Sequence, residues 1–297
     1  MLKVGLAKQP YSGHFGRQEY DEGPNVMEQG GLLKHLDEWD CEVTEIKEVK
    51  LTTEEDKRYG LRYRLGLANN HLADIVADQI KADILPIGLM ANCNGLMGML
   101  AGHQRAGPNW KPLRVGLVWV DAHGDFNTPE TSLSGMMGGM PVAISTGQCL
   151  HHIRRASGLE PPLPMSYVTM VGVRDTDPME QYLIDKHQIS QITVEDIKRL
   201  SPAIDMEMDR LSRITDIVYV HVDLDILDLE DIPGAGLPVE NGPTADELAE
   251  ALEVMFEYPN VKGYGMASYP WRRDEERRGL KSVYRLVEGV VSGVKNR

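Results

Sequence analysis

The 297-residue chain is predicted to be an α/β protein, a three-layer αβα sandwich with a mainly parallel central sheet. Short apolar runs, typical of buried strands, alternate with longer segments whose apolar residues recur at helical spacing, as in sheets covered on both faces. In addition, two of the apolar runs end in acidic clusters, and the ends of strands are where such sheets place their sites. We expect one domain over residues 1–297, because no repeat, low-complexity tract or linker interrupts the pattern.

The first half of the chain opens with a strand at Leu2–Ala7 and an edge strand at Cys41–Glu48. Arg62–Lys81 has leucine, isoleucine and valine at helical spacing and is predicted to be a helix. A strand at Ile84–Leu89 follows, and then a helix over Asn94–Gly102, whose glycines permit close packing.

The second half continues the alternation. The remaining strands are predicted at Val115–Val120, Tyr167–Val173, Ile217–Val222 and Gly263–Ser268. Helices are predicted to start at Thr193, to include Met206–Ile214, to run from Thr244 through Phe256, and to close the chain over Glu275–Val294. The third of these opens with Thr-Ala-Asp-Glu, a capping-box pattern.

Composition excludes several classes of function. The net charge of −14, from 31 basic and 45 acidic residues, argues against binding to nucleic acid or to an anionic membrane. No apolar run approaches membrane-spanning length, and the N-terminus lacks the apolar stretch of a signal peptide. Three cysteines without paired spacing provide no disulfide framework and suit a reducing compartment, so we expect a cytoplasmic protein.

Two clusters of potential metal ligands follow apolar strands. Asp121, His123 and Asp125 alternate at two-residue spacing after the first strand, so their side chains should converge where it ends. Asp223 and Asp225 follow the second strand in the same way. A single Asp-x-Asp is usually a solvated strand end or a helix cap, and a lone histidine is more often a core residue. Two such clusters together favour a metal site, because unpaired buried carboxylates would repel one another.

Residues 121–141, DAHGDFNTPETSLSGMMGGMP, and 220–228, VHVDLDILD, resemble the ureohydrolases, the family of arginase, agmatinase and formimidoylglutamase. The resemblance extends over nearly the whole chain. It implies an arginase-like fold and a pair of manganese ions whose bridging hydroxide attacks a guanidino or amidino carbon. It also implies a small-molecule guanidino or amidino substrate and a homo-oligomer, a trimer or a hexamer.

The resemblance assigns the metal ligands residue by residue. It implies that Asp121 and Asp223 bridge two Mn²⁺ ions, that Asp125 completes one ion, and that His123 and Asp225 complete the other. Asp125 and His123 thereby lie at the catalytic centre. The family supplies one further histidine, but the corresponding position here holds Cys93. A thiolate is a soft ligand for a hard ion, so one metal is expected to be weak or absent. Ligation by Cys93 and simple packing of a small buried residue are both open.

Around the substrate, the chain keeps some family positions and loses others. The resemblance implies that Asn127, Ser134 and Asp177 contact the substrate. Gly138 stands where arginases have a proton-shuttle histidine, Ala267 where they have a glutamate that pairs with the guanidinium, and Leu237 where they have a threonine. Free arginine is therefore not the expected substrate.

Three functions are compared. The first is metal-dependent hydrolysis of a C–N bond in a linear amidine or guanidino compound. The second is a catalytically impaired binding or regulatory protein with the same fold, which the missing histidine and glutamate favour. The third, nucleotide binding, is disfavoured because no glycine-rich phosphate loop follows a predicted strand.

Overall fold

The computed structural model describes residues 1–13, 20–108 and 111–297 and confirms the predicted α/β sandwich. Eight strands form one sheet in the order β2-β1-β3-β8-β7-β4-β5-β6, and every described pairing is parallel. The strands are β1 (Leu2–Gln9), β2 (Cys41–Glu48), β3 (Leu85–Met90), β4 (Val115–Val120), β5 (Val168–Val171), β6 (Ser190–Ile192), β7 (Ile217–Asp223) and β8 (Val261–Ala267).

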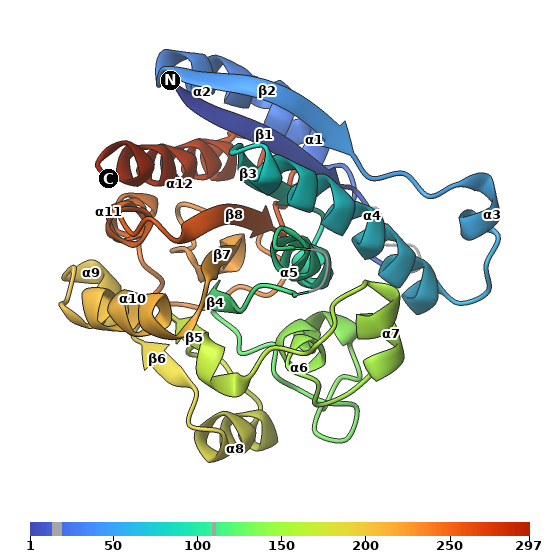
Figure 1. Ribbon diagram of the computed structural model, residues 1–297. Coiled ribbons are helices and arrows are strands. Elements are labelled where there is room, and N and C mark those ends of the chain that lie inside the picture. The colour runs from blue at the N-terminus through green and yellow to red at the C-terminus, as the bar shows by residue number, and fades with distance from the viewer. Residues whose placement is uncertain (14–19, 109–110) are drawn as a thin grey trace.

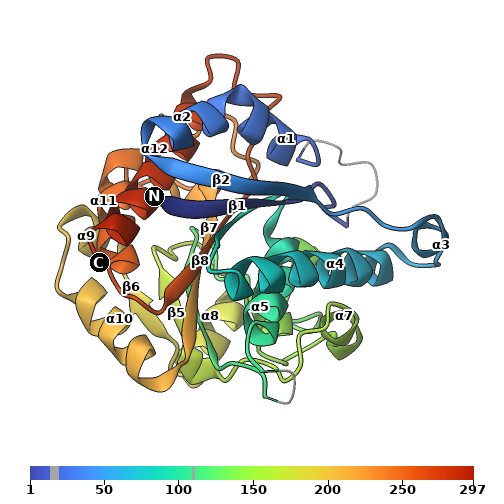
Figure 2. The same cartoon turned by 45° about the horizontal axis from the view of Figure 1, so that its top comes forward.

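Helices cover both faces of this sheet (Figures 1 and 2). On one face lie α4 (Leu61–Lys81), α5 (Leu96–Arg105), α6 (Pro141–Ser145) and α7 (His151–Ala156). On the other lie α1 (Gly23–Met27), α2 (Leu33–Glu38), α9 (Val194–Lys198), α10 (Ala203–Ile214), α11 (Ala245–Phe256) and α12 (Arg278–Lys295). Helix α3 (Thr53–Asp56) lies in an arm away from the sheet, and α8 (Pro178–Lys186) lies beside β6 at the opposite edge.

The core is divided by the sheet into two apolar layers. One layer joins the sheet to α10, α11 and α12, and the other joins it to α4 and α5. The glycines of α5 allow close contact with α4, as predicted, because a Cβ at Gly98 would lie 2.8 Å from the carbonyl oxygen of Asn69. The capping box of α11 is also confirmed: the hydroxyl oxygen of Thr244 accepts the backbone N–H of Glu247.

Some elements differ from the sequence prediction. Strand β5 spans Val168–Val171, which is shorter than predicted, and the short strand β6 was not predicted. Helices α1, α2, α3, α6, α7 and α8 were not predicted either; all are nine residues or fewer, too short for apolar periodicity to reveal. No helix in the described ranges is long and apolar enough to cross a membrane.

Because all strands are parallel, their carboxyl ends meet at one edge of the sheet. In the sheet, β3 and β4 are not adjacent, because β8 and β7 lie between them. The carboxyl ends of these four strands, which come from distant parts of the sequence, are therefore neighbours. Cys93, Asp121 and Ser268 follow β3, β4 and β8, and Asp223 is the last residue of β7. This convergence produces the candidate site.

Candidate metal centre

A cavity of about 350 Å³ opens at the carboxyl ends of the strands. All nine residues that the sequence assigned to metal or substrate line it: Cys93, Asp121, His123, Asp125, Asn127, Ser134, Asp177, Asp223 and Asp225. The cavity floor is buried, because Cys93, Asp121, Asp125, Asp223 and Asp225 each expose less than a tenth of their surface. The fold therefore gathers the candidate residues around one enclosed space.

The loop after β4 is held in shape by its own ligand candidates. Asp121 accepts the backbone N–H of His123 through Oδ1 at 2.7 Å. Asp125 adopts a left-handed φ of 46°, uncommon for a residue with a side chain, and its carbonyl accepts the N–H groups of Val142 and Ala143 at the start of α6. The loop is thus held at His123 and at Asp125, and the side chains of Asp121 and Asp125 line the cavity.

The end of β7 repeats this local geometry. Asp223 accepts the backbone N–H of Asp225 through Oδ1 at 3.1 Å, just as Asp121 does for His123. The other oxygen of Asp223 lies 2.7 Å from Cys93 Sγ and accepts the hydroxyl of Ser268, also at 2.7 Å. Asp223 thereby connects the carboxyl ends of β3, β7 and β8.

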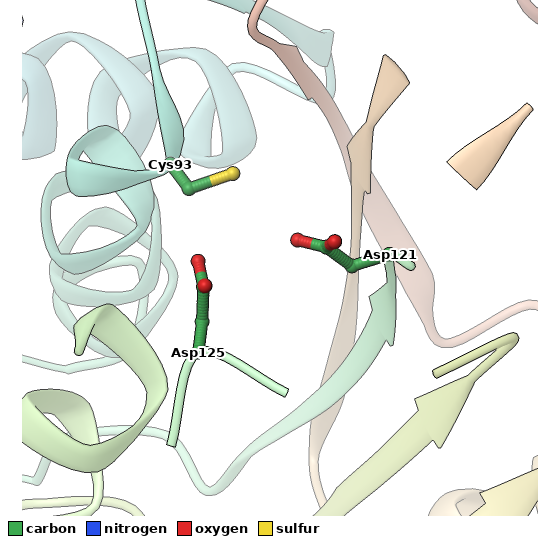
Figure 3. A group of neighbouring side chains, drawn as sticks. All are labelled: Cys93, Asp121 and Asp125. Atoms are coloured by element: carbon green, nitrogen blue, oxygen red, sulfur yellow. The ribbon is translucent and has the colours of Figure 1, made fainter. Parts of the chain in front are cut away.

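The candidate ligands form two groups that share Asp121. One group contains Cys93, Asp121 and Asp125, whose side chains point toward a common space from two segments, the one after β3 and the loop after β4 (Figure 3). The other contains Asp121, His123 and Asp225. Within each group the potential ligand atoms lie within 4.8 Å of one another, which is compatible with a single ion between them. A site for two neighbouring cations is the simplest description of this geometry.

The electrostatics of the site call for positive charge. Burial, together with the neighbouring carboxylates, raises the pKa of Asp121 and of Asp125 well above the usual range. The same causes raise the pKa of Asp223 to about 7. Burial disfavours the charged form of His123, yet hydrogen bonds and proximity to Asp121 and Asp225 raise its pKa to about 12. Each shift reflects negative charge crowded into a region with little solvent.

The donor set fits metal ions. Within the described part of the chain, Asp225 Oδ1 is buried without a hydrogen-bond partner, although buried carboxylate oxygens are normally paired. The same residue faces His123 through its other oxygen, 3.4 Å from Nδ1. Oxygen and imidazole ligands suit a hard or borderline divalent cation, and a cation would pair with the free oxygen while offsetting the repulsion among the acids.

Cys93 follows β3 in a short 3-10 turn, Cys93–Gly95, and is buried. Its Sγ faces the acidic cluster (Figure 3). Burial, and then the nearby charges of Asp223 and Asp121, raise its pKa well above the usual value of a thiol. The sulfur lies on the cavity wall beside two carboxylates and is also part of a buried apolar cluster, so this geometry is compatible with ligation and with simple packing.

The three predicted substrate residues lie together on one wall but use their polar atoms in different ways. Asn127 Nδ2 donates to Asp177 Oδ2 at 3.1 Å, and Asn127 Oδ1 accepts the hydroxyl of Thr131 at 2.9 Å. Ser134 is exposed at the rim, where its Oγ accepts the backbone N–H of Met136. Asn127 and Asp177 therefore shape this wall, and Ser134 is the most accessible of the three.

The positions at which the chain departs from arginases also have clear locations. Gly138 lines the cavity and offers no side chain. Leu237 lines it as an exposed apolar residue. Ala267 is fully buried in the core, and the cavity wall at the end of β8 is formed by the next residue, Ser268.

Sequence reasoning did not assign three residues that shape the site. Glu180 is buried at the cavity and accepts the backbone N–H groups of Phe126 and Asp177, at 2.8 and 3.1 Å. Ser268 holds Asp223, and His221 lies 3.3 Å from Cys93 Sγ. Glu180 could have been found from the pattern Asp-Pro-x-Glu, typical of a capped helix start. Nothing local in the sequence marks the other two, because their partners are distant in the chain.

Fold and site together define an α/β protein with an acidic candidate metal centre at its strand ends. A family model described as "Arginase family" matches residues 3–276. The arginase of Bacillus caldovelox is 31% identical over 249 residues, which cover 81% of this chain and 82% of that protein. Human arginase-1 is 29% identical over 270 residues, covering 88% and 82%.

Solved structures agree. The crystal structure of the arginase from Bacillus subtilis has a TM-score of 0.84 at 27% identity and covers 98% of each chain. The formimidoylglutamase from Bacillus subtilis shares the fold, with a TM-score of 0.76 at 18% identity, covering 99% of this chain and 88% of that chain. The chain belongs to the arginase family. This membership, with the ligand clusters, supports a metal-dependent hydrolase that acts on C–N bonds.

Proposed function

We propose that the protein hydrolyses a C–N bond of a linear amidine or guanidino compound other than free arginine. The observation that carries this proposal is the pair of candidate ligand groups that share Asp121 at the floor of one cavity. The acidic cavity and the net charge of −14 favour a cationic small molecule over an anionic one. We also propose that residues 1–297 form one domain of a cytoplasmic homo-oligomer, a trimer or hexamer, as the resemblance implies.

The proposed cofactor is a pair of divalent cations. The resemblance favours Mn²⁺, and the oxygen and imidazole atoms of Asp121, His123 and Asp225 suit it. When bound, such ions lower the pKa of water and polarise the substrate. The chain itself contributes orientation: hydrogen bonds from His123 and Asp225 fix Asp121 and Asp223, and burial of the floor limits access of bulk water.

Substrate binding is assigned to the wall that contains Asn127, Ser134 and Asp177. Ser134, at the rim, is the residue whose hydroxyl an incoming substrate meets first, whereas Asn127 and Asp177 hold one another at 3.1 Å. The end of β8 offers a free guanidinium no carboxylate, because Ala267 and Ser268 stand there. This supports a substituted or otherwise modified guanidine, or an amidine, over arginine.

The alternative is a binding or regulatory protein with the same fold. Gly138 is the observation that favours it, since this cavity position carries no side chain that could move a proton. Such a protein would keep cation and ligand binding without turnover.

One experiment separates the two functions. The purified protein is analysed for metal by mass spectrometry, loaded with Mn²⁺, and incubated with a panel of guanidino and amidino compounds that includes arginine. Release of urea, ammonia or amide from a compound other than arginine would support the enzyme. Binding of panel compounds by calorimetry without any product would support the regulatory protein. A protein that binds neither metal nor compound would refute both.

A further inference from the structure

A buried chain of polar groups lies behind Cys93, on the side away from the cavity. Tyr219 Oη is 2.9 Å from His221 Nδ1, and His221 Nε2 is 3.3 Å from Cys93 Sγ. Cys93 Sγ is in turn 2.7 Å from Asp223 Oδ2. All four residues are buried. The chain therefore runs from the interior of the sheet to the candidate metal ligands.

The hydrogen-bond donors and acceptors of these four residues fit together in one consistent arrangement. The Asp223 carboxylate accepts, so the Cys93 thiol donates to it. His221 Nε2 then carries a hydrogen and donates to sulfur, which leaves Nδ1 to accept the Tyr219 hydroxyl. The same N–H would donate to a thiolate sulfur bound to a cation, with no change in the imidazole. His221 thus suits sulfur in either role.

The imidazole is held firmly in this position. Its ring stacks on Trp119 with centroids 4.6 Å apart and planes inclined by 14°. Space for the Tyr219 hydroxyl comes from Gly265 on β8, since a Cβ at that glycine would lie 2.1 Å from the Tyr219 oxygen. Strand β8 therefore leaves room for the group that orients His221, and β4 supplies the ring on which it rests.

We propose that His221 is a positioning residue that directs Cys93 Sγ toward Asp121 and Asp125, so that sulfur is a ligand of the second cation. This inference rests on the proposed metal centre. Hydrogen bonds to a ligand atom from behind commonly orient it and strengthen metal binding, and their removal weakens affinity about 10- to 100-fold. Because one ligand is sulfur, this position would take a thiophilic divalent cation, such as Co²⁺ or Zn²⁺, in preference to Mn²⁺.

The test uses Co²⁺ as the probe, because thiolate ligation produces a charge-transfer absorption in the near ultraviolet. The parent protein is titrated with Co²⁺, and the band and the affinity are recorded. We expect His221→Leu to lose the band and to bind the second Co²⁺ at least about tenfold more weakly. His221→Gln keeps an N–H donor and should recover part of both. Tyr219→Phe, which removes only the hydroxyl, should weaken the band.

His103→Leu is the matched control. His103 is also fully buried and packs against the Tyr219 ring, with centroids 5.0 Å apart, but its Nδ1 faces the carbonyl oxygen of Met99 rather than sulfur. If a buried histidine acts only by packing, its replacement by leucine lowers the stability of the protein and leaves the cobalt band unchanged. The control should therefore retain the band of the parent protein.

The outcomes separate this inference from the proposed function. If the parent protein binds two Co²⁺ ions with a thiolate band and His221→Leu keeps both, the inference is wrong while the metal centre stands. Two bound ions without a thiolate band also overturn it. If the parent protein binds Mn²⁺ but no Co²⁺, the inference is wrong while the metal centre stands, and if it binds neither ion, the metal centre falls as well. Should His221→Leu not fold, Tyr219→Phe decides, and an unchanged band in that variant rejects the inference.

Discussion

Asp121 accepts the backbone N–H of His123 through Oδ1 at 2.7 Å, so one candidate ligand fixes the chain that carries the next. The imidazole Nδ1 of His123 lies 3.3 Å from the same oxygen. The relationship recurs at the end of β7, where Asp223 holds Asp225. In both places, the aspartate at the strand end holds the backbone of the residue two positions later, which is itself a candidate ligand. The sequence pattern Asp-x-ligand therefore provides two candidate ligands and the hydrogen bond that orients the second.

Asp223→Asn should remove metal while nearly preserving shape. The amide can still accept the Ser268 hydroxyl but brings no charge to a cation, and metal affinity depends on deprotonated ligands. When the free metal concentration is about one hundred times the dissociation constant, bound metal stabilises a protein by about 2.7 kcal/mol. For a protein of this length, that corresponds to an increase of roughly 5 °C in melting temperature. The variant should lose most of this Mn²⁺-dependent increase in a thermal melt. Asp209→Asn, on the surface of α10, is the control, and an equal metal content and melting response in both variants would show that Asp223 is not a ligand.

The sequence predicted the parts of the site that are local to one strand end. The motif after one apolar run predicted that Asp121, His123 and Asp125 gather at one strand end, although the extended backbone assumed for them does not continue to Asp125, whose φ is 46°. The parallel sheet follows from the alternation of strands and helices. Sequence cannot show which strand ends become neighbours, because that depends on the crossover from β3 to β4. For this reason Ser268 and His221, which act across strands, were not assigned from the sequence. The family resemblance, rather than spacing, brought Cys93 to the site.

Glu180→Ala should destabilise the loop that carries Asp125. The buried carboxylate accepts the backbone N–H groups of Phe126 and Asp177, and alanine would leave both donors without this partner, that of Phe126 in a buried place. Hydrogen bonds to charged groups contribute about 1.5–3 kcal/mol each, so we expect a loss of at least about 2 kcal/mol in urea unfolding. Glu180→Gln keeps one acceptor oxygen and should lose less. Glu250→Ala, exposed on α11, is the control; a Glu180→Ala variant as stable as this control would contradict the bracing role.

His103 should make the protein sensitive to acid. Burial lowers its pKa from 6.5 to about 4. Between pH 6.5 and pH 4, His103 binds a proton in the unfolded chain but not in the folded chain. The contribution of neutral His103 to stability is therefore fully present above pH 6.5 and is lost as the pH falls toward 4. From the size of the shift, we expect about 2 kcal/mol less stability at pH 5 than at pH 7 from this residue.

Urea unfolding of the parent, His103→Gln and His152→Gln proteins at both pH values measures this contribution. Other groups also titrate between these pH values, and the change in stability that they cause is common to the three proteins; the loss due to His103 adds to it. The loss should be smaller in His103→Gln by about the amount due to His103, whereas His152→Gln, changed at an exposed position of α7, should keep the difference of the parent. An equal loss in all three proteins would mean that His103 is protonated as readily when folded as when unfolded.

Changing Cys93 itself tests whether sulfur belongs to the metal centre. If the thiolate ligates, Cys93→Ser should weaken one of two bound ions selectively and reduce the preference for Co²⁺ or Zn²⁺ over Mn²⁺. The ion at Asp121, His123 and Asp225 should be unaffected, since that group does not contain Cys93. Metal stoichiometry by mass spectrometry after dialysis against each ion gives the answer.

Cys93→His is the complementary change, because it restores the residue that the family supplies at this position. An imidazole suits Mn²⁺ better than sulfur does, so a second tightly bound Mn²⁺ should appear in this variant. Cys149→Ser is the control for loss of a buried thiol elsewhere, and it should leave both ions in place. If Cys93→Ser and Cys93→His both retain the stoichiometry and ion preference of the parent protein, Cys93 is only a packed residue. Asp121 and Asp125 would then hold the second ion without sulfur.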